Sequence, residues 1–144
     1  MKFSRYVFAI AGLYGLVTLI PGYFLEAIIA SNDSPPITHA EFFYGFIGVA
    51  LAWQIMFFVI AFDPPRYRLA MLIALLEKLA FGVAAVVLFA LHRVATPVLG
   101  LGLIDLALGV LFLIAYFATQ GSPSVGVVAT KRSQADCDTA YVER

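Results

Sequence analysis

Four polar residues lie in stretches of the sequence that are otherwise apolar: Gln54, Glu77, Lys78 and Asp105. A charge inside a bilayer costs roughly 2.5–3.5 kcal/mol on insertion scales, so it requires either a partner or a function. Glu77 and Lys78 can form an internal ion pair, with Gln54 as a further hydrogen-bond partner. The alternative is a functional site that binds a proton or a lipid head group, or one that uses Glu77 or Asp105 as a general acid or base.

A second polar group lies near the ends of the apolar stretches: Glu26, His39, Glu41, His92 and Arg93. Acids with two histidines suggest a metal site. However, His39 and Glu41 are only two residues apart and His92 has no second ligand at helical spacing, so no zinc pattern is present. Two interpretations remain, namely interfacial charges in which Arg93 pairs with an acid, or an outer pocket that these acids and His92 form together with Asp105.

The elements that must position these residues are four apolar runs, at residues 6–30, 42–62, 69–91 and 98–118. Each has about 20 residues or more, the length that a helix needs to cross roughly 30 Å of hydrocarbon. Backbone polar groups cannot remain unpaired in lipid, so the runs predict helices. Pro21 predicts a kink in the first run. Thr96 is the expected N-cap of the fourth helix, with Pro97 at its first position.

Composition agrees with this class of protein. Hydrophobic residues make up 62% of the 144 residues and charged residues only 12%, against about a quarter in soluble domains. Lys and Arg together number 9, as do Asp and Glu, which argues against a nucleic-acid binder. The sequence therefore predicts an all-α fold, a bundle of four transmembrane helices running up-down-up-down.

The distribution of positive charge predicts the orientation of this bundle. Basic residues precede the first run, separate the second from the third and follow the fourth: Lys2, Arg5, Arg66, Arg68, Lys131 and Arg132. The first connection has none and the third has only Arg93. By the positive-inside rule, both termini are cytoplasmic. Arg66 and Arg68 are expected to contact anionic lipid head groups.

Depth along the helices divides the buried polar residues into two sets. At 1.5 Å per residue, Glu77 lies about 12 Å from the inner end of its run and Asp105 about 10 Å from the outer end of its own. Gln54, Glu77 and Lys78 are therefore expected to form an inner-to-middle group, and Asp105 to belong to the outer half. Gly102 and Gly109, at helical spacing from Asp105, predict that this acid faces other helices.

Two segments have special interpretations. Residues 1–30 could be a cleaved signal peptide, but the apolar stretch is longer than the usual 7–15 residues and Glu26 interrupts it, which favours a retained helix. Residues 119–144 are polar and are expected to form a disordered cytoplasmic tail outside the transmembrane domain of residues 1–118. The tail holds Cys137, the single cysteine, so no internal disulfide can form.

Three segments resemble parts of small, uncharacterised bacterial four-helix membrane proteins: residues 41–54 (EFFYGFIGVALAWQ), residues 63–68 (DPPRYR) and residues 76–79 (LEKL). An acid followed by a glycine-rich second helix is similar to the DoxX-like group. That resemblance implies a bacterial plasma membrane and an accessory role in membrane redox or sulfur-related assemblies. It implies no particular catalytic residue.

Three functions are consistent with the sequence. The first is an accessory or scaffold protein that contacts lipids, another membrane protein or a further copy of itself. The second is a binder or carrier of a small amphipathic molecule in the outer-half pocket. The third is a membrane enzyme that uses an intramembrane carboxylate. No cofactor motif or metal-binding pattern is present, which favours the first two.

Overall fold

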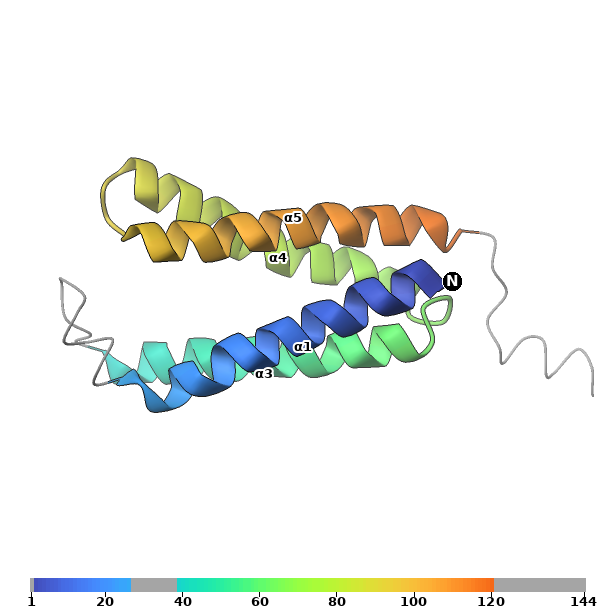
Figure 1. The fold of residues 1–144 in the computed structure, drawn as a ribbon, viewed down its shortest axis with the longest axis horizontal. Coiled ribbons are helices and arrows are strands. Elements are labelled where there is room, and N and C mark those ends of the chain that lie inside the picture. Colours follow the sequence, from blue (N-terminus) through green and yellow to red (C-terminus); the bar gives the residue numbers. More distant parts are fainter. Residues whose placement is uncertain (1, 27–38, 121–144) are drawn as a thin grey trace, which may run out of the picture.

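The computed structural model describes residues 2–26 and 39–120, and within them the fold is four helices of 23 residues each. These are α1 (Lys2–Phe24), α3 (Ala40–Phe62), α4 (Arg68–Ala90) and α5 (Thr96–Ala118). The prediction of an all-α, four-helix bundle is confirmed. Consecutive helices run in opposite directions (Figure 1).

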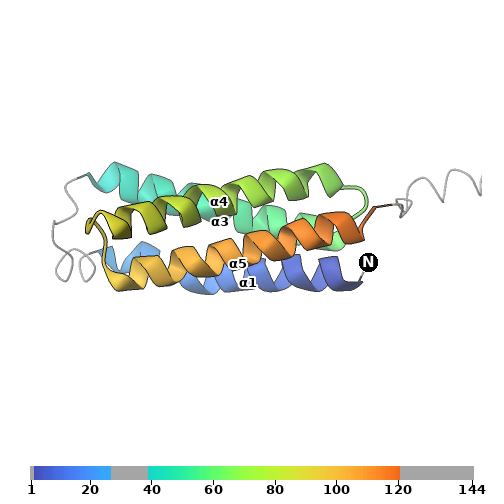
Figure 2. The ribbon, with the colours of Figure 1, turned by 90° about the horizontal axis from the view of Figure 1, so that it is seen from above.

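Two helix pairs make up the bundle. α1 packs along α3 and α4 packs along α5, while α1 also contacts α5; α3 and α4 touch one another at few points. Figure 1 shows α1 beside α3 and α4 beside α5, and Figure 2, seen from above, shows the α4–α5 pair in front of the other pair. The N-terminus, the α3–α4 turn and the end of α5 share one end of the bundle, called here the N-terminal end (Figure 1). The α4–α5 turn lies at the opposite end.

Each helix is long and apolar enough to cross a bilayer. A helix of 23 residues is about 34 Å long, slightly more than the hydrocarbon thickness. Large apolar side chains cover the outer surface, for example Val17, Phe62, Leu69 and Leu76, which are 64–85% exposed. Such a surface is suited to lipid rather than to water. The chain is a multi-pass membrane protein.

The main cluster of buried apolar side chains lies in the N-terminal half of the bundle. Phe8 stacks on Phe112 at 4.2 Å between ring centroids, and Phe112 meets Phe57 edge-on at 5.1 Å. All three rings are fully buried. Nearby, Ser4 at the start of α1 hydrogen-bonds Thr119 just beyond α5, at 3.0 Å. The cluster contains residues of all four helices and so joins them at this end of the bundle.

The helix ends differ from the predicted ends in several places. α1 begins at Lys2 rather than at residue 6 and ends at Phe24 rather than at residue 30, one turn after Pro21. Pro21 lies inside α1, and the helix continues for three residues beyond it although proline has no backbone N–H to donate. The rest of the predicted first helix, at residues 27–30, lies outside the described residues. The other boundaries agree with the prediction to within two residues.

Two predicted roles at the ends of α5 are corrected. Ala95, with extended backbone, is the N-cap instead of Thr96, and Pro97 is therefore the second helical residue. No side-chain hydrogen bond caps this end, since an alanine has none to offer. Thr119 is buried and bonded to Ser4, so it belongs to the bundle and not to the tail. The remaining tail, from residue 121, lies outside the described residues.

Candidate functional site

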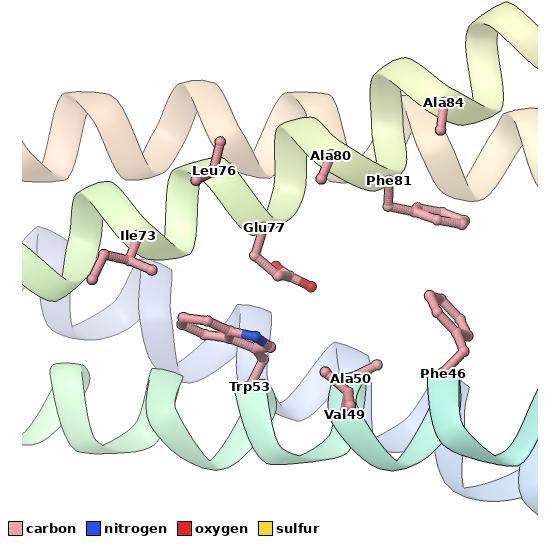
Figure 3. Close-up of a pocket in the computed structure, with 10 residues that line it drawn as sticks. All are labelled: Phe46, Val49, Ala50, Trp53, Ile73, Leu76, Glu77, Ala80, Phe81 and Ala84. Carbon is pink, nitrogen blue, oxygen red and sulfur yellow. The ribbon is translucent and has the colours of Figure 1, made fainter. Parts of the chain in front are cut away.

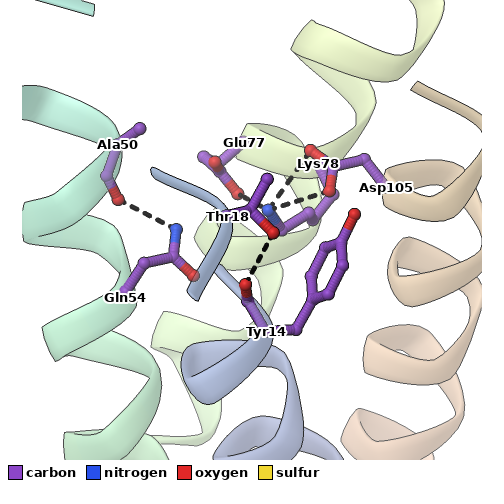
Figure 4. A network of polar contacts seen from close by, with 7 residues as sticks. All are labelled: Tyr14, Thr18, Ala50, Gln54, Glu77, Lys78 and Asp105. Atoms are coloured by element: carbon purple, nitrogen blue, oxygen red, sulfur yellow. Dashed lines mark hydrogen bonds and ion pairs between the residues drawn. The ribbon is translucent and has the colours of Figure 1, made fainter. Parts of the chain in front are cut away.

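Two carboxylates share one ammonium group near the middle of the bundle (Figure 4). The Lys78 Nζ lies 3.2 Å from each carboxylate oxygen of Asp105, and one of these contacts is a hydrogen bond. The same Nζ lies 3.3 Å from Glu77 Oε2. That contact is an ion pair without hydrogen-bond geometry, because Glu77 Oε2 is buried and accepts no hydrogen bond. With all three groups ionised, the cluster carries one net negative charge.

Antiparallel packing of α4 against α5 brings this cluster together. Glu77 is nine residues from the start of α4 and Asp105 nine from the start of α5, about 13 Å from opposite ends. Each helix is about 33 Å long from first to last residue, so the axial distance between Glu77 and Asp105 is only about 6 Å. The long side chain of Lys78, the neighbour of Glu77, spans this distance. Asp105 does lie in the outer half by depth, but the expectation that it is separate from the group of Glu77 and Lys78 is wrong, because Lys78 contacts it.

Glycine permits the close approach of α4 and α5. A Cβ on Gly82 would lie 2.6 Å from a side-chain carbon of Leu106 and 3.0 Å from the carbonyl oxygen of Gly102. Gly102 and Gly109 are both buried, so the face of α5 that carries them is turned toward other helices. Only a residue without a side chain fits this contact.

Gln54 contributes a buried oxygen without a partner in the described part of the chain. Its Nε2 donates to the Ala50 carbonyl at 2.9 Å, one turn back on α3. Its Oε1 is buried without a hydrogen-bond partner among the described residues, and the side chain is 1% exposed. Gly15 of α1 makes room for it, since a Cβ there would collide with the Gln54 amide. Gln54 is thus held under α1, close to the charged cluster.

A small central cavity of about 100 Å³ lies between these groups. Its polar lining comes from all four helices: Tyr14 and Thr18 of α1, Gln54 of α3, Glu77 and Lys78 of α4, and Asp105 of α5. The Thr18 hydroxyl donates to the Tyr14 carbonyl at 2.8 Å (Figure 4). At about 30 Å³ per molecule, the cavity has room for about three waters or one small polar group.

A larger and mostly apolar groove runs between α3 and α4, where these helices touch least (Figure 3). Its volume is about 480 Å³, and its lining residues are Phe46, Val49, Ala50, Trp53, Ile73, Leu76, Glu77, Ala80, Phe81 and Ala84. Figure 3 shows the Glu77 carboxyl group directed from α4 into the space opposite Trp53 and Ala50. We call it the α3–α4 groove.

The groove and the central cavity meet at Glu77. Both are lined by Phe46, Ala50, Glu77 and Phe81. The Glu77 side chain is 18% exposed, compared with 6% for Lys78 and 13% for Asp105. Glu77 is therefore the member of the cluster that is presented to a molecule in the groove.

Sequence reasoning did not find the groove. Nothing in the sequence indicates that the aromatic residues Phe46, Trp53 and Phe81 line one groove. A gap between α3 and α4 has no signal in a single sequence, since consecutive helices with a short turn are expected to pack along their length.

The predicted outer-half residues are not brought into one cluster. Glu26 accepts a hydrogen bond from the Tyr44 hydroxyl at 2.6 Å, and exposed His39 lies 3.2 Å from exposed Glu41. His92 and Arg93 are exposed in the α4–α5 turn, where His92 has a positive φ of 56°. Asp105, expected to join them, lies with Lys78 instead. Within residues 2–26 and 39–120, no three His, Cys, Asp or Glu side chains are grouped as metal ligands would be.

Comparison of the chain with protein-family models, with curated proteins and with solved structures gave no match. The resemblance to the DoxX-like group therefore stays a prediction, and the argument for function rests on the site.

Proposed function

We propose that this membrane protein binds a small amphipathic molecule that is dissolved in the bilayer, and that the α3–α4 groove holds it. The observation that carries the proposal is a carboxylate, Glu77, at the base of an apolar groove. Residues on the rim of this groove, such as Val49 and Leu76, are each 64% exposed on the outer surface of the bundle. A molecule can thus reach Glu77 directly from the lipid.

The dimensions and lining of the groove fit such a ligand. Small-molecule sites usually enclose about 300–1,000 Å³, and the groove, at about 480 Å³, is within this range. Such sites are mainly apolar with a few polar groups that orient the ligand. Here the aromatic side chains of Phe46, Trp53 and Phe81 supply the apolar wall, and Glu77 supplies the polar end. The site lies near the middle of the helices instead of in the outer half.

Native mass spectrometry of the protein released from mild detergent tests the proposal. The wild-type chain is expected to carry a bound small amphiphile. Ala80→Phe places a ring in the groove and should reduce the bound fraction at least about tenfold. Ala52→Phe is the matched control, because Ala52 is exposed on α3 and does not line the groove.

The two variants separate groove binding from general lipid adhesion. Equal retention of the amphiphile by both variants would contradict the proposal, as would a wild-type chain that carries none. Loss from Ala80→Phe alone, with the Ala52→Phe chain still loaded, supports it.

The bacterial plasma membrane, with both termini cytoplasmic, is the location that we propose. In the described part of the chain, Lys2, Arg5, Arg66 and Arg68 gather at the N-terminal end, whereas the opposite end has Arg93. The positive-inside rule supports this orientation.

The accessory or scaffold role remains a prediction, and so does an enzymatic role for Glu77 or Asp105. An accessory protein would co-purify with a second protein in a fixed ratio. An enzyme would show a pH–rate profile that shifts when its acid is replaced. Ligand binding in the groove is compatible with either role.

A further inference from the structure

We infer that the polar end of the bound molecule is a primary ammonium group, so that the ligand is an amphipathic amine. This inference rests on the proposed binding in the α3–α4 groove and specifies the chemistry of its polar end. It follows from three features of the boundary between the groove and the central cavity: charge, unpaired acceptors and size.

The charge of the site selects a cation. The charged side chains that line the groove and the central cavity are Glu77, Lys78 and Asp105. Two carboxylates and one ammonium leave one net negative charge when all are ionised, and in a medium of low dielectric constant such a charge requires a counter-charge. A second ammonium, from the ligand, makes the site neutral. A phosphate or carboxylate head group would add to the excess negative charge.

The unpaired atoms of the site select a hydrogen-bond donor. Gln54 Oε1 is a buried oxygen without a hydrogen-bond partner among the described residues, and buried Glu77 Oε2 has only its 3.3 Å ion pair with Lys78 Nζ and no hydrogen bond. A buried acceptor left without a partner costs about 1–3 kcal/mol. A primary ammonium has three N–H donors, so it can satisfy Glu77 and one further acceptor in the cavity. A quaternary ammonium has the charge but no donor.

The volumes fit this arrangement. The central cavity, of about 100 Å³, accepts a group as small as an ammonium, and the groove, of about 480 Å³, accepts its apolar part. Phe46, Trp53 and Phe81 line the groove on the way to Glu77, and aromatic faces attract cations by about 0.5–2 kcal/mol. The groove thus offers an amine aromatic side chains as well as the Glu77 carboxylate.

Trp53 provides a direct test, because it is the single tryptophan of the chain and lines the groove. The full-length protein is placed in lipid nanodiscs, and its fluorescence is titrated with four amphiphiles that share one brominated alkyl chain. Their head groups are primary ammonium, trimethylammonium, hydroxyl and carboxylate. Bromine quenches tryptophan only at close contact, so saturable quenching reports occupation of the groove.

The primary amine is expected to bind best, at least about tenfold more tightly than the trimethylammonium and carboxylate probes. Glu77→Gln should weaken the amine at least about tenfold and leave the alcohol nearly unchanged. Gln54→Leu should weaken the amine but not the trimethylammonium probe, which donates no hydrogen bond. In the Ala80→Phe variant the new ring fills the groove, so this variant measures the background quenching by probe molecules that are dissolved in the bilayer.

The outcomes separate this inference from the proposed function. If no probe quenches the wild type more than it quenches Ala80→Phe, groove binding itself is wrong. If quenching is saturable but does not depend on the head group, the groove binds amphiphiles while waters or a proton satisfy the cluster, and the amine inference is overturned. Preference for the carboxylate or the alcohol would overturn it as well. These comparisons use the wild-type chain, so they do not depend on the folding of a Glu77 or Gln54 variant.

Discussion

At the scale of single residues, Lys78 binds its two acidic partners, Asp105 and Glu77, with different geometry. Its ammonium lies 3.2 Å from both oxygens of Asp105 and hydrogen-bonds one of them, whereas Glu77 approaches through one oxygen at 3.3 Å without a hydrogen bond. Lys78 and Glu77 are adjacent on α4 and point about 100° apart, which prevents good geometry between them. Asp105 is thus the structural partner of Lys78, and Glu77 is left available to the groove.

This inequality predicts different effects of two isosteric substitutions. Asp105→Asn should lower the free energy of unfolding by about 3 kcal/mol or more, because it leaves the Lys78 ammonium without its best partner in a buried site. Glu77→Gln should lower it clearly less than Asp105→Asn does, since Lys78 keeps its hydrogen-bonded partner Asp105 when the ion pair with Glu77 is removed. Unfolding by SDS titration in a mild detergent measures both. A Glu77→Gln variant as unstable as Asp105→Asn would contradict this assignment of roles.

At the scale of elements, small residues decide where the helices approach closely. Gly15 lets α1 lie against the Gln54 side chain of α3, and Gly82 lets α4 lie against Leu106 of α5. Gly45 and Gly48 of α3, by contrast, have no atom within 4 Å of an added Cβ. The same residue type therefore has two roles in this chain, and only the buried glycines hold the site together.

The contrast predicts opposite effects of adding one methyl group. Gly15→Ala should destabilise the bundle by about 1–3 kcal/mol, because the new Cβ collides with the Gln54 amide. Gly48→Ala should leave it unchanged or more stable by up to about 1 kcal/mol, since alanine favours helix more than glycine does. Thermal unfolding in one detergent compares the two. Adding Gln54→Ala to the Gly15→Ala chain should recover part of the loss, and no recovery would mean that the contact has another cause.

At the scale of the whole molecule, the apolar core and the α3–α4 groove occupy different parts of the bundle. The Phe8, Phe57 and Phe112 cluster fills the N-terminal half, while the α3–α4 groove extends along the side where α3 and α4 touch least. α3 and α4 can lie apart there because α1 and α5 hold their partner helices on the other side. The groove is therefore a property of the assembled bundle and not of any single helix.

The orientation of this bundle can be tested with the single cysteine, Cys137. If the C-terminal end is cytoplasmic, a membrane-impermeant maleimide should label Cys137 only after bacterial spheroplasts are permeabilised. The matched control is the Cys137→Ala chain with His92→Cys, because His92 is exposed at the opposite end. That control should react in intact spheroplasts. The reverse pattern of labelling would show that the positive-inside interpretation is wrong for this chain.

The number of helices and their suitability for a membrane followed from the sequence by itself. Each apolar run is long enough to cross the hydrocarbon, and lipid offers no partner for an unpaired backbone group, so local composition was sufficient. The same reasoning found Gln54, Glu77, Lys78 and Asp105, since a polar residue in an apolar run is visible without knowing its neighbours. The end of α1 was less well predicted. The apolar run continues to residue 30, but the helix ends at Phe24.

Only the tertiary structure decided how those polar residues combine. Counting residues placed Asp105 with the outer acids, but the packing of α4 on α5 at Gly82 brings it within reach of Lys78. Likewise, the α3–α4 groove depends on two helices that do not touch along their length, although they are consecutive in the chain. The periodicity of one helix shows which of its faces is small or polar, but not how far away its neighbour lies. That distance is set by side chains of other helices, such as Leu106 against Gly82 and Gln54 against Gly15.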